Sequence, residues 1–230
     1  MKKSFLFIGL IAAILCLQGC PIEIPPVDNS GEENGHNYVD MGTSVMWATC
    51  NIGASVVGEY GDRIAWGELE TKEYYADSTY KWYDIEQKKY TKYVLNDNKG
   101  TTIDNLTTLE LEDDVAHVKW GGTWRMPTEE EMQELIDKCN FEYKETEYGP
   151  GFLVTAKNNN RMFLPLSKIW DDGVKWGYYW TSSLSTETDK SYVLWLTDDN
   201  NARYEGRYEI KRYIRYIDYN IRPVCVPKSK

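Results

Sequence analysis

The sequence is poor in histidine and in positive charge. It contains 2 His in 230 residues, and 26 Lys and Arg stand against 36 Asp and Glu, which gives a formal net charge of −10. An acidic chain repels phosphates at long range, so the composition argues against nucleic acid as a partner. A catalytic nucleophile needs an adjacent base, and the two imidazoles, His36 and His117, stand in no catalytic pattern. Glycosidases need a pair of carboxylates in a cleft, and 36 acids single out no such pair. We therefore expect a protein that is not an enzyme.

Cysteine is also sparse. The 5 cysteines form no Cys-x-x-Cys pair and no cluster with histidine, so we expect no zinc site, and we predict no metal or other cofactor. Long apolar runs are absent beyond residue 17, which argues against a membrane-spanning helix in the rest of the chain.

Aromatic residues are abundant by contrast. They make up 14% of the chain, with 18 Tyr, 9 Trp and 5 Phe, beside 42% apolar and 27% charged residues. So many aromatic side chains exclude intrinsic disorder, because they cannot all remain solvated. The length supports a sizeable core, and no repeat or second linker divides residues 38–230, which we expect to form one domain.

Residues 1–19 predict a lipoprotein signal peptide. Two lysines precede the apolar run 5–17, which is too short to cross a bilayer. The run ends in Leu-Gln-Gly-Cys20, which resembles a bacterial lipobox and implies that Cys20 is acylated and becomes the mature N-terminus. An ordinary signal peptide that ends near a cysteine is the alternative. Pro21 follows in place of the aspartate that favours retention in the inner membrane of some bacteria, so we expect the outer membrane.

The predicted mature protein is tethered to a bilayer through its lipid and does not cross it. Cleavage removes two lysines and no acid, which changes the net charge to −12. Residues 20–37, the acylated cysteine and a segment with three Pro and two Gly, predict a flexible spacer. We expect a lipid-anchored protein of the cell envelope, and its exposure at the cell surface stays open.

Two helices are predicted in the middle of the chain. The first begins at Asp113 or Asp114 and ends at Gly121-Gly122. The second spans Thr128–Asn140, where Thr128 and Glu131 form a capping box. Its buried face is predicted from four residues at i, i+3, i+4 and i+7 spacing, namely Met132, Leu135, Ile136 and Cys139.

Short strands rich in β-branched or aromatic residues are predicted through most of the remaining chain. They are Val45–Ile52, Arg63–Trp66, Tyr90–Leu95, Phe152–Ala156, Arg161–Leu166, Tyr178–Ser183, Ser191–Thr197 and Ile221–Val226. Asn158-Asn159-Asn160 predicts a hairpin turn, because asparagine tolerates positive φ. Tyr192–Leu196 is apolar on both faces, as a covered central strand requires. Together these patterns predict an α+β fold with antiparallel sheets.

Several short segments follow one another along the chain in a distinctive order. The segments are Tyr38-Val39-Asp40-Met41-Gly42, Trp47-Ala48-Thr49-Cys50-Asn51-Ile52-Gly53-Ala54, Tyr60-Gly61-Asp62, Ala65-Trp66-Gly67-Glu68, Asp113-Asp114-Val115-Ala116, Trp120-Gly121-Gly122-Thr123-Trp124-Arg125-Met126-Pro127-Thr128-Glu129, Phe163-Leu164-Pro165, Gly177-Tyr178-Tyr179-Trp180-Thr181-Ser182-Ser183 and Ile221-Arg222-Pro223-Val224-Cys225. In this order they resemble the Fibrobacter succinogenes major paralogous domain, a family common in lipoproteins of gut Bacteroidota. The resemblance covers residues 38–226.

The resemblance implies a C-type-lectin-like domain, with two helices packed on small antiparallel β-sheets and with paired terminal strands. If the terminal strands pair, Cys50 and Cys225 become the expected disulfide, with Cys139 buried on its helix. The calcium-binding motifs of sugar-binding lectins with this fold, such as Glu-Pro-Asn and Trp-Asn-Asp, are absent. The resemblance therefore implies a ligand-binding module that needs no calcium.

The C-terminal third carries the candidate ligand-binding residues. Between 202 and 222 six positive residues outnumber three acids, and tyrosine and asparagine are frequent between 198 and 220. Tyrosine, asparagine and arginine are typical of adaptable recognition surfaces. The alternative is a set of exposed strands stabilised by aromatic and Arg–Glu pairs across strands.

We expect a binding face built by the 170–180 loop and the 198–219 segment. Its residues are Trp170, Trp176, Asp198, Asn200, Arg203, Tyr204, Arg207, Tyr208, Tyr213 and Tyr216. Alternatively, Asp198 and Asn200 belong to a solvated turn and bind no ligand. Most other tryptophans, namely Trp47, Trp66, Trp120, Trp124, Trp180 and Trp195, are expected in the core.

The sequence thus predicts a non-enzymatic, adhesin-like envelope lipoprotein that binds an unknown protein or glycan. Two alternatives stay open. One is an accessory or structural subunit of an envelope or pilus assembly, and the other is a retroelement-diversified receptor.

Overall fold

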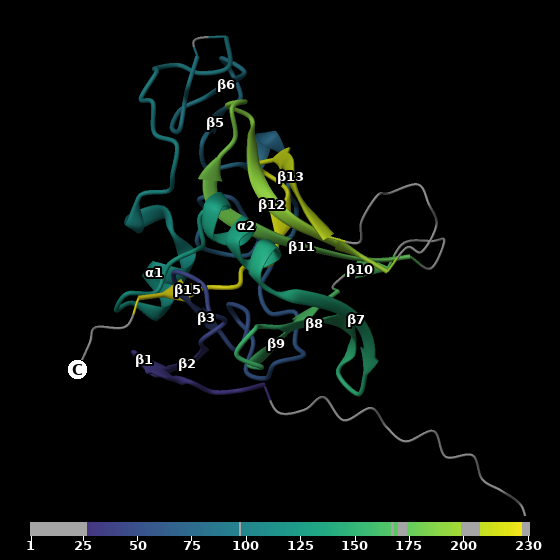
Figure 1. The fold of residues 1–230 in the computed structure, drawn as a ribbon. Helices are drawn as coiled ribbons and strands as arrows, with labels where there is room; N and C mark the ends of the chain where they lie inside the picture. Colours follow the sequence, from purple (N-terminus) through teal and green to yellow (C-terminus); the bar gives the residue numbers. More distant parts are fainter. Residues whose placement is uncertain (1–26, 97, 167, 170–173, 199–207, 227–230) are drawn as a thin grey trace, which may run out of the picture.

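The computed structural model describes residues 27–226 apart from 97, 167, 170–173 and 199–207 (Figure 1). The described chain is α+β, as expected, with every strand ladder antiparallel. In this part of the chain no helix is long and apolar enough to span a membrane.

The longest strands form a four-stranded sheet in the order β10-β11-β12-β13. The strands are β10 (Lys168–Ile169), β11 (Lys175–Leu184), β12 (Lys190–Thr197) and β13 (Tyr208–Ile214). As predicted, β12 is a covered central strand, and Val193–Leu196 have no exposed surface. β13 was not predicted as a strand; its residues are half-buried except Glu209 and Arg212, which are exposed.

Both helices begin at their predicted caps, and the first also ends as predicted, whereas the second ends at Lys138, before the predicted Asn140, which begins the next strand. Helix α2 (Glu129–Lys138) has the expected capping box, since Thr128 Oγ1 accepts the N–H of Glu131 (3.2 Å) and Glu131 accepts the N–H of Thr128 (2.8 Å). Helix α1 (Val115–Trp120) starts at Asp114, whose carboxylate accepts the N–H groups of Ala116 (2.9 Å) and His117 (3.1 Å). It ends at Gly121, which has a positive φ of 65°.

The main core lies between α2, the long sheet and a three-stranded sheet β7-β8-β9. These strands are β7 (Asn140–Thr146), β8 (Gly149–Thr155) and β9 (Arg161–Pro165). Figure 1 shows α2 crossing the long sheet, with β7–β9 beyond its C-terminal end. Met132 and Leu135 are buried and Ile136 packs against the same core, while Asn159 takes the positive φ (69°) of the predicted turn between β8 and β9.

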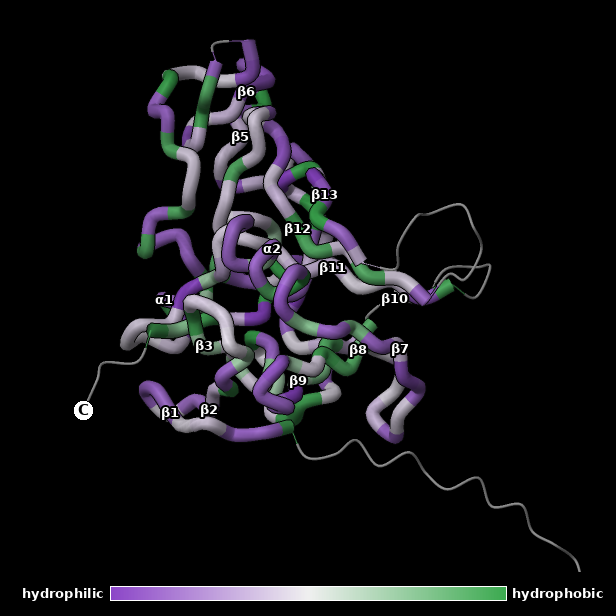
Figure 2. Tube along the Cα trace, viewed as in Figure 1, coloured by the Kyte–Doolittle hydropathy of each residue, from purple (hydrophilic) through white to green (hydrophobic). Residues whose placement is uncertain are grey.

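A second four-stranded sheet joins the two ends of the described chain, in the order β1-β2-β3-β15. Its strands are β1 (Gly31–Glu33), β2 (His36–Val39), β3 (Met46–Ala48) and β15 (Val224–Cys225). The expected pairing of terminal strands is therefore present. Part of the predicted spacer is folded, because Trp124 Nε1 donates to Glu33 O (2.7 Å) and the His36 ring stacks on Trp120 at 3.9 Å. In Figure 2 the tube of this β1–β2 hairpin is mostly purple to white, so the hairpin is largely hydrophilic.

Two short ribbons complete the fold: β4 (Ile64–Ala65) with β14 (Asp218–Tyr219), and β5 (Tyr83–Asp84) with β6 (Lys89–Tyr90). The 3₁₀ turns η1 (Asp77–Thr79) and η2 (Leu111–Asp113) flank β5–β6. Segment 74–100, which contains β5–β6, forms the projection at the top of Figure 1, and we call it the β5–β6 lobe.

The expected Cys50–Cys225 disulfide is not formed, since both thiols and that of Cys139 are free. The strand register explains this result. Cys225 lies opposite Met46, four residues before Cys50 in the chain, so the two cysteines are at different levels of the sheet. Cys139 is buried at the end of α2, as expected, and burial raises the pKa of its thiol to about 11.

Candidate functional site

Half of the predicted binding residues are described by the structure. Trp170, Asn200, Arg203, Tyr204 and Arg207 lie outside the described residues, as does the predicted lipidation site Cys20. The other five residues are Trp176, Asp198, Tyr208, Tyr213 and Tyr216. They do not form one continuous face.

Tyr208 and Tyr213 lie on opposite faces of the long sheet, although both belong to β13. The Tyr208 ring stacks on Phe141 of β7 at 4.5 Å and packs against the main core. The Tyr213 ring contacts Tyr178 (5.2 Å) and Tyr219 (5.7 Å) edge to face in a second core cluster. An odd separation places two strand residues on opposite faces, so these two tyrosines cannot bind one flat ligand together.

Trp176 shares the Tyr213 face of the sheet. Its ring lies 5.1 Å from Trp195 and is parallel to Tyr178 at 6.4 Å. Trp195 is fully buried, and the Lys211 ammonium covers its ring at 3.4 Å. Trp176 is half-buried and packs against this core cluster, so its ring helps to stabilise the sheet.

Asp198 has a structural role at the end of β12. Its carboxylate accepts the backbone N–H of Lys175 (2.8 Å) and lies 3.5 Å from the ammonium of the same residue. Lys175 in turn forms an ion pair with Glu145 at 2.5 Å. Asp198 therefore closes the junction of β11 with β12.

Two of the six positive residues between 202 and 222 are buried. Arg215 and Arg222 have no exposed surface. Arg215 donates to the backbone carbonyls of Lys92 (3.2 Å) and Tyr93 (3.0 Å), and its guanidinium lies over the Tyr90 ring at 4.2 Å. Because these two guanidinium groups are inside the fold, they add no positive charge to the surface of the described C-terminal segment.

Tyr216 lines a cavity of about 170 Å³ between the β5–β6 lobe and the long sheet, which we call the Tyr216 cavity. Three separate stretches of chain form its wall, and its residues are Asp77, Tyr83, Lys88, Tyr90, Lys99, Asp189, Ile214 and Tyr216. Three tyrosines and four charged side chains thus surround one small space.

The walls of the Tyr216 cavity are held firmly. The rings of Tyr83 and Tyr90 meet edge to face at 5.2 Å, and Tyr90 is only 5% exposed. Lys99 and Asp189 form an ion pair at 2.9 Å across the lobe and the β11–β12 turn. Burial opposes the ionisation of Asp189, but the hydrogen bond and charge of Lys99 outweigh it and keep the pKa of Asp189 below its usual range. The cavity therefore offers aromatic faces beside fixed charges at neutral pH.

The sequence pattern did not identify most of this cavity. Tyr83, Lys88 and Lys99 belong to the β5–β6 lobe and Asp189 to the distant β11–β12 turn, and none of them carries a recognisable motif. They meet only because the lobe folds back on the end of β13, where Tyr216 packs against the buried Tyr80, Tyr90 and Val94 cluster. The frequency of tyrosine in segment 198–219 was the one sequence signal that pointed here.

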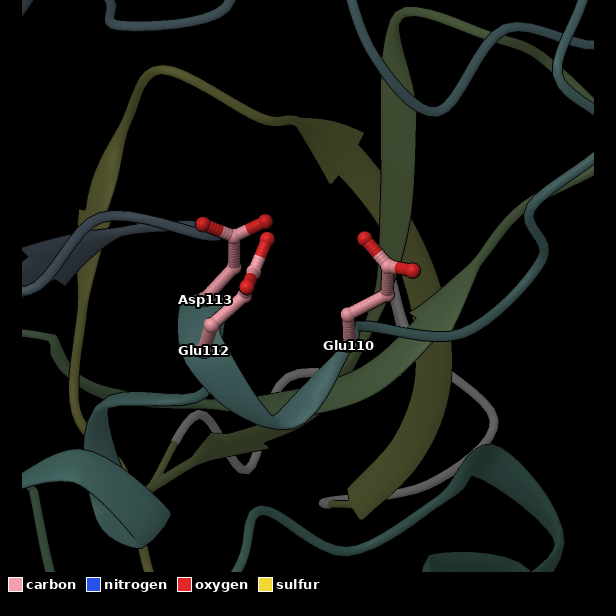
Figure 3. A group of neighbouring side chains, drawn as sticks. All are labelled: Glu110, Glu112 and Asp113. Carbon is pink, nitrogen blue, oxygen red and sulfur yellow. The ribbon is translucent and has the colours of Figure 1, made fainter.

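An acidic cluster lies at η2. Among the described residues, Glu110, Glu112 and Asp113 bring carboxylate oxygens within 4.8 Å of one another. Figure 3 shows Glu112 and Asp113 side by side and Glu110 facing them. The Lys92 ammonium lies 2.5 Å from Glu110, 3.4 Å from Glu112 and 2.7 Å from Asp113.

Lys92 thus occupies the position that a cation would take in this cluster. Lys81 adds a second ammonium 3.0 Å from Asp113, and Tyr93 donates its hydroxyl to the same carboxylate at 2.7 Å. Burial opposes ionisation of Asp113, but these partners outweigh it and lower its pKa. The acids are neutralised by the protein itself, and the cluster joins the lobe to η2.

Neither histidine lies beside a nucleophile in the described contacts. His117 Nδ1 is 3.1 Å from the carbonyl oxygen of Trp124, and the His36 ring is covered by Trp120. Partial burial lowers the pKa of His36, although the charge of Glu32 opposes this effect. Both imidazoles stabilise the contact between α1, its following loop and the β1–β2 hairpin.

Known proteins do not suggest a function for this chain, so the Tyr216 cavity is the feature on which a functional proposal rests. No protein-family model, no curated protein and no solved structure matches this chain.

Proposed function

We propose that this chain is a non-enzymatic lipoprotein of the cell envelope that recognises a glycan, and that the Tyr216 cavity binds one sugar unit of it. The observation that carries the proposal is the combination of aromatic and charged walls in one small cavity. Sugar rings present apolar C–H faces and polar edges, so they fit tyrosine rings next to charged hydrogen-bonding groups.

The size of the cavity favours a single small ring. Its volume of about 170 Å³ is below the roughly 300–1,000 Å³ typical of sites for drug-sized ligands. Tyr216 and Tyr83 supply ring surface, while Lys88, Lys99 and Asp189 supply donors and acceptors. A longer glycan would place one residue in the cavity and extend along the surface.

Recognition in this proposal needs no calcium. Calcium sites require several oxygen ligands that converge on the ion. The Asp198 carboxylate is engaged by Lys175, and the acidic cluster at η2 is engaged by Lys92 and Lys81. The oxygen atoms most suited to calcium are therefore already neutralised by ammonium groups.

We also propose that the fold is C-type-lectin-like and that the chain belongs to the Fibrobacter succinogenes major paralogous domain family. Paired terminal strands, two helices and small antiparallel sheets support this assignment. The motif residues Trp47, Trp66, Trp124 and Trp180 are fully buried, as expected of residues that define a fold. The proposed acylation of Cys20 would tether this domain to the outer membrane.

The test is a glycan array probed with the full chain, purified in detergent, and with two variants. Replacing Tyr216 with Ala (Y216A) should weaken binding to the recognised glycan about fivefold, since aromatic contacts contribute roughly 1 kcal/mol. Removing the exposed charge in Lys88→Met should also reduce binding, without disturbing the core.

The control is Tyr74→Ala, which removes a tyrosine of the same lobe that is 67% exposed and lies outside the cavity wall. It should bind like the unaltered protein. Full binding by both Tyr216→Ala and Lys88→Met would exclude the cavity as the site. Absence of binding to every glycan by the unaltered chain would contradict glycan recognition itself.

A further inference from the structure

The long sheet ends at β13, whose outer edge is unpaired within the described residues. Just beyond β13, the Arg215 N–H donates to Asp189 O (3.1 Å). In the same register, Tyr213 lies opposite Ser191, and Lys211 lies opposite Val193. Hydrogen bonding alternates along an antiparallel strand, so Glu209, Lys211 and Tyr213 bond to β12. The backbone groups of Ile210 and Arg212 therefore point away from the sheet, and no described group bonds to them.

This edge is accessible in part, since Glu209 and Arg212 are exposed and the other residues of β13 are half-buried. An open groove of about 450 Å³ lies beside it, lined by Glu187, Lys190, Ile210, Lys211, Arg212 and Tyr213. Four consecutive strand residues line the groove, so the groove follows the strand. An edge with free N–H and C=O groups is a template for a further strand.

The side chains of β13 are complementary to a second copy of the same strand. Glu209 and Lys211 lie on one face, and their charged groups are 3.0 Å apart. Tyr208, Ile210 and Arg212 lie on the other face. In an antiparallel pair with Ile210 opposite Ile210 of the second copy, Glu209 faces Lys211 of that copy and Tyr208 faces its Arg212.

Other symmetric registers are less favourable. Centring the pair on Glu209, Lys211 or Arg212 places two like charges directly opposite each other, which destabilises a strand pair. When the pair is centred on Ile210, Glu209 of each copy lies opposite Lys211 of the other copy. Each Lys211 ammonium then lies between the Glu209 carboxylate of its own strand and that of the second copy. The charge pattern of the strand thus favours one register.

We propose that β13 is an interface through which two copies of this chain pair edge to edge, with Ile210 at the two-fold axis. The two long sheets then form one continuous antiparallel sheet. The paired residues Tyr208–Arg212 lie outside the wall of the Tyr216 cavity, so the two proposals stand independently. The occupant is a second copy because the strand complements its own sequence in charge and in register.

The first test measures self-association of the full chain in detergent by sedimentation over a concentration series. The unaltered protein should dimerise. Glu209→Lys should weaken the dimer about tenfold or more, because two opposite-charge pairs become like-charge pairs. The double variant Glu209→Lys/Lys211→Glu should restore the dimer, since it exchanges the charges and keeps the pattern.

Disulfide trapping tests the register. In the proposed pair, residue 209 faces residue 211 of the second copy, while 209 and 209 are diagonal neighbours roughly 8 Å apart, beyond disulfide reach. Glu209→Cys/Lys211→Cys should therefore form a covalent dimer under mild oxidation. Each single cysteine variant should remain monomeric on a non-reducing gel, which also controls for the native thiols.

A monomeric unaltered chain at all concentrations would overturn the interface. Failure of the charge exchange to restore a dimer lost in Glu209→Lys would overturn the register, and so would a covalent dimer of Lys211→Cys alone. Circular dichroism of every variant checks that a variant which does not dimerise is still folded. If Glu209→Lys is unfolded, the disulfide trapping experiment decides whether the interface exists.

Discussion

Single charged residues act mainly as connectors between distant segments of this protein. Lys92 joins the lobe to η2, and Lys99 joins it to the β11–β12 turn. Glu134 connects α2 to the loop before β3, because it accepts the N–H of Ser44 (2.9 Å) and the ammonium of Lys138 (2.6 Å). The Lys138 hydrogen bond, followed by that of Ser44, lowers the pKa of Glu134 to about 2.

Glu134 should therefore stabilise the fold in a pH-dependent way. Its folded pKa lies below the unfolded value of about 4.3, so its contribution is complete above pH ~5 and is lost as the pH falls towards 2. Glu134→Gln should cost about 1 kcal/mol of unfolding free energy at pH 7, since solvent screens a partly exposed pair. The difference from the unaltered protein should vanish near pH 2.

Urea unfolding at several pH values measures this effect. Glu130→Gln, which changes an exposed acid on the same helix, provides the control and should cost less unfolding free energy at pH 7 than Glu134→Gln. An equal loss from Glu134→Gln at every pH would show that shape, and not charge, explains the contribution of Glu134.

At the scale of elements, α2 is the part of the fold best supported by local interactions. Its capping box satisfies N–H groups at the start of the helix, and three glutamates occupy its first turn. Arg125 fixes Glu131 from outside the helix, with Nη1 2.7 Å from its carboxylate. Because α2 covers the long sheet, a frayed start of the helix would also expose the main core.

Thr128→Ala should destabilise the protein by about 1 kcal/mol, because the cap of Glu131 N–H is lost. Thr128→Ser keeps the hydroxyl and should retain most of the stability. Thermal unfolding followed by circular dichroism compares the two variants. A serine variant as unstable as the alanine variant would mean that the methyl group of Thr128, and not its hydroxyl, is the important contact.

At the scale of the whole molecule, Arg222 connects three parts of the fold. Its guanidinium donates to Ala48 O (2.9 Å) in β3, to Asn51 Oδ1 (2.8 Å) and to Phe163 O (2.8 Å) in β9. It is fully buried, and burial is the main cause that lowers its pKa. The planar fork of an arginine can satisfy acceptors in several directions at once, which an ammonium cannot do.

Arg222→Lys should therefore destabilise the protein by about 3 kcal/mol, since buried carbonyl groups lose their donors. Arg212→Lys, a change at an exposed arginine of β13, should have little effect on the same measurement. Chemical denaturation at low protein concentration compares the variants without a contribution from pairing. Equal stability of the two variants would contradict the connecting role of Arg222.

The sequence by itself determined the two helices, the hairpin at Asn159, the covered strand β12 and the burial of most tryptophans. These features depend on local signals, such as caps, turn residues and apolar periodicity, that act within a few residues. Only the tertiary structure decided how the C-terminal tyrosines are used. Strand alternation separates Tyr208 from Tyr213, and the folded-back lobe turns Tyr216 into a cavity wall. The free thiols of Cys50 and Cys225 and the folded β1–β2 hairpin likewise depend on the pairing of distant strands. The register between such strands is set by long-range contacts that no local sequence pattern encodes.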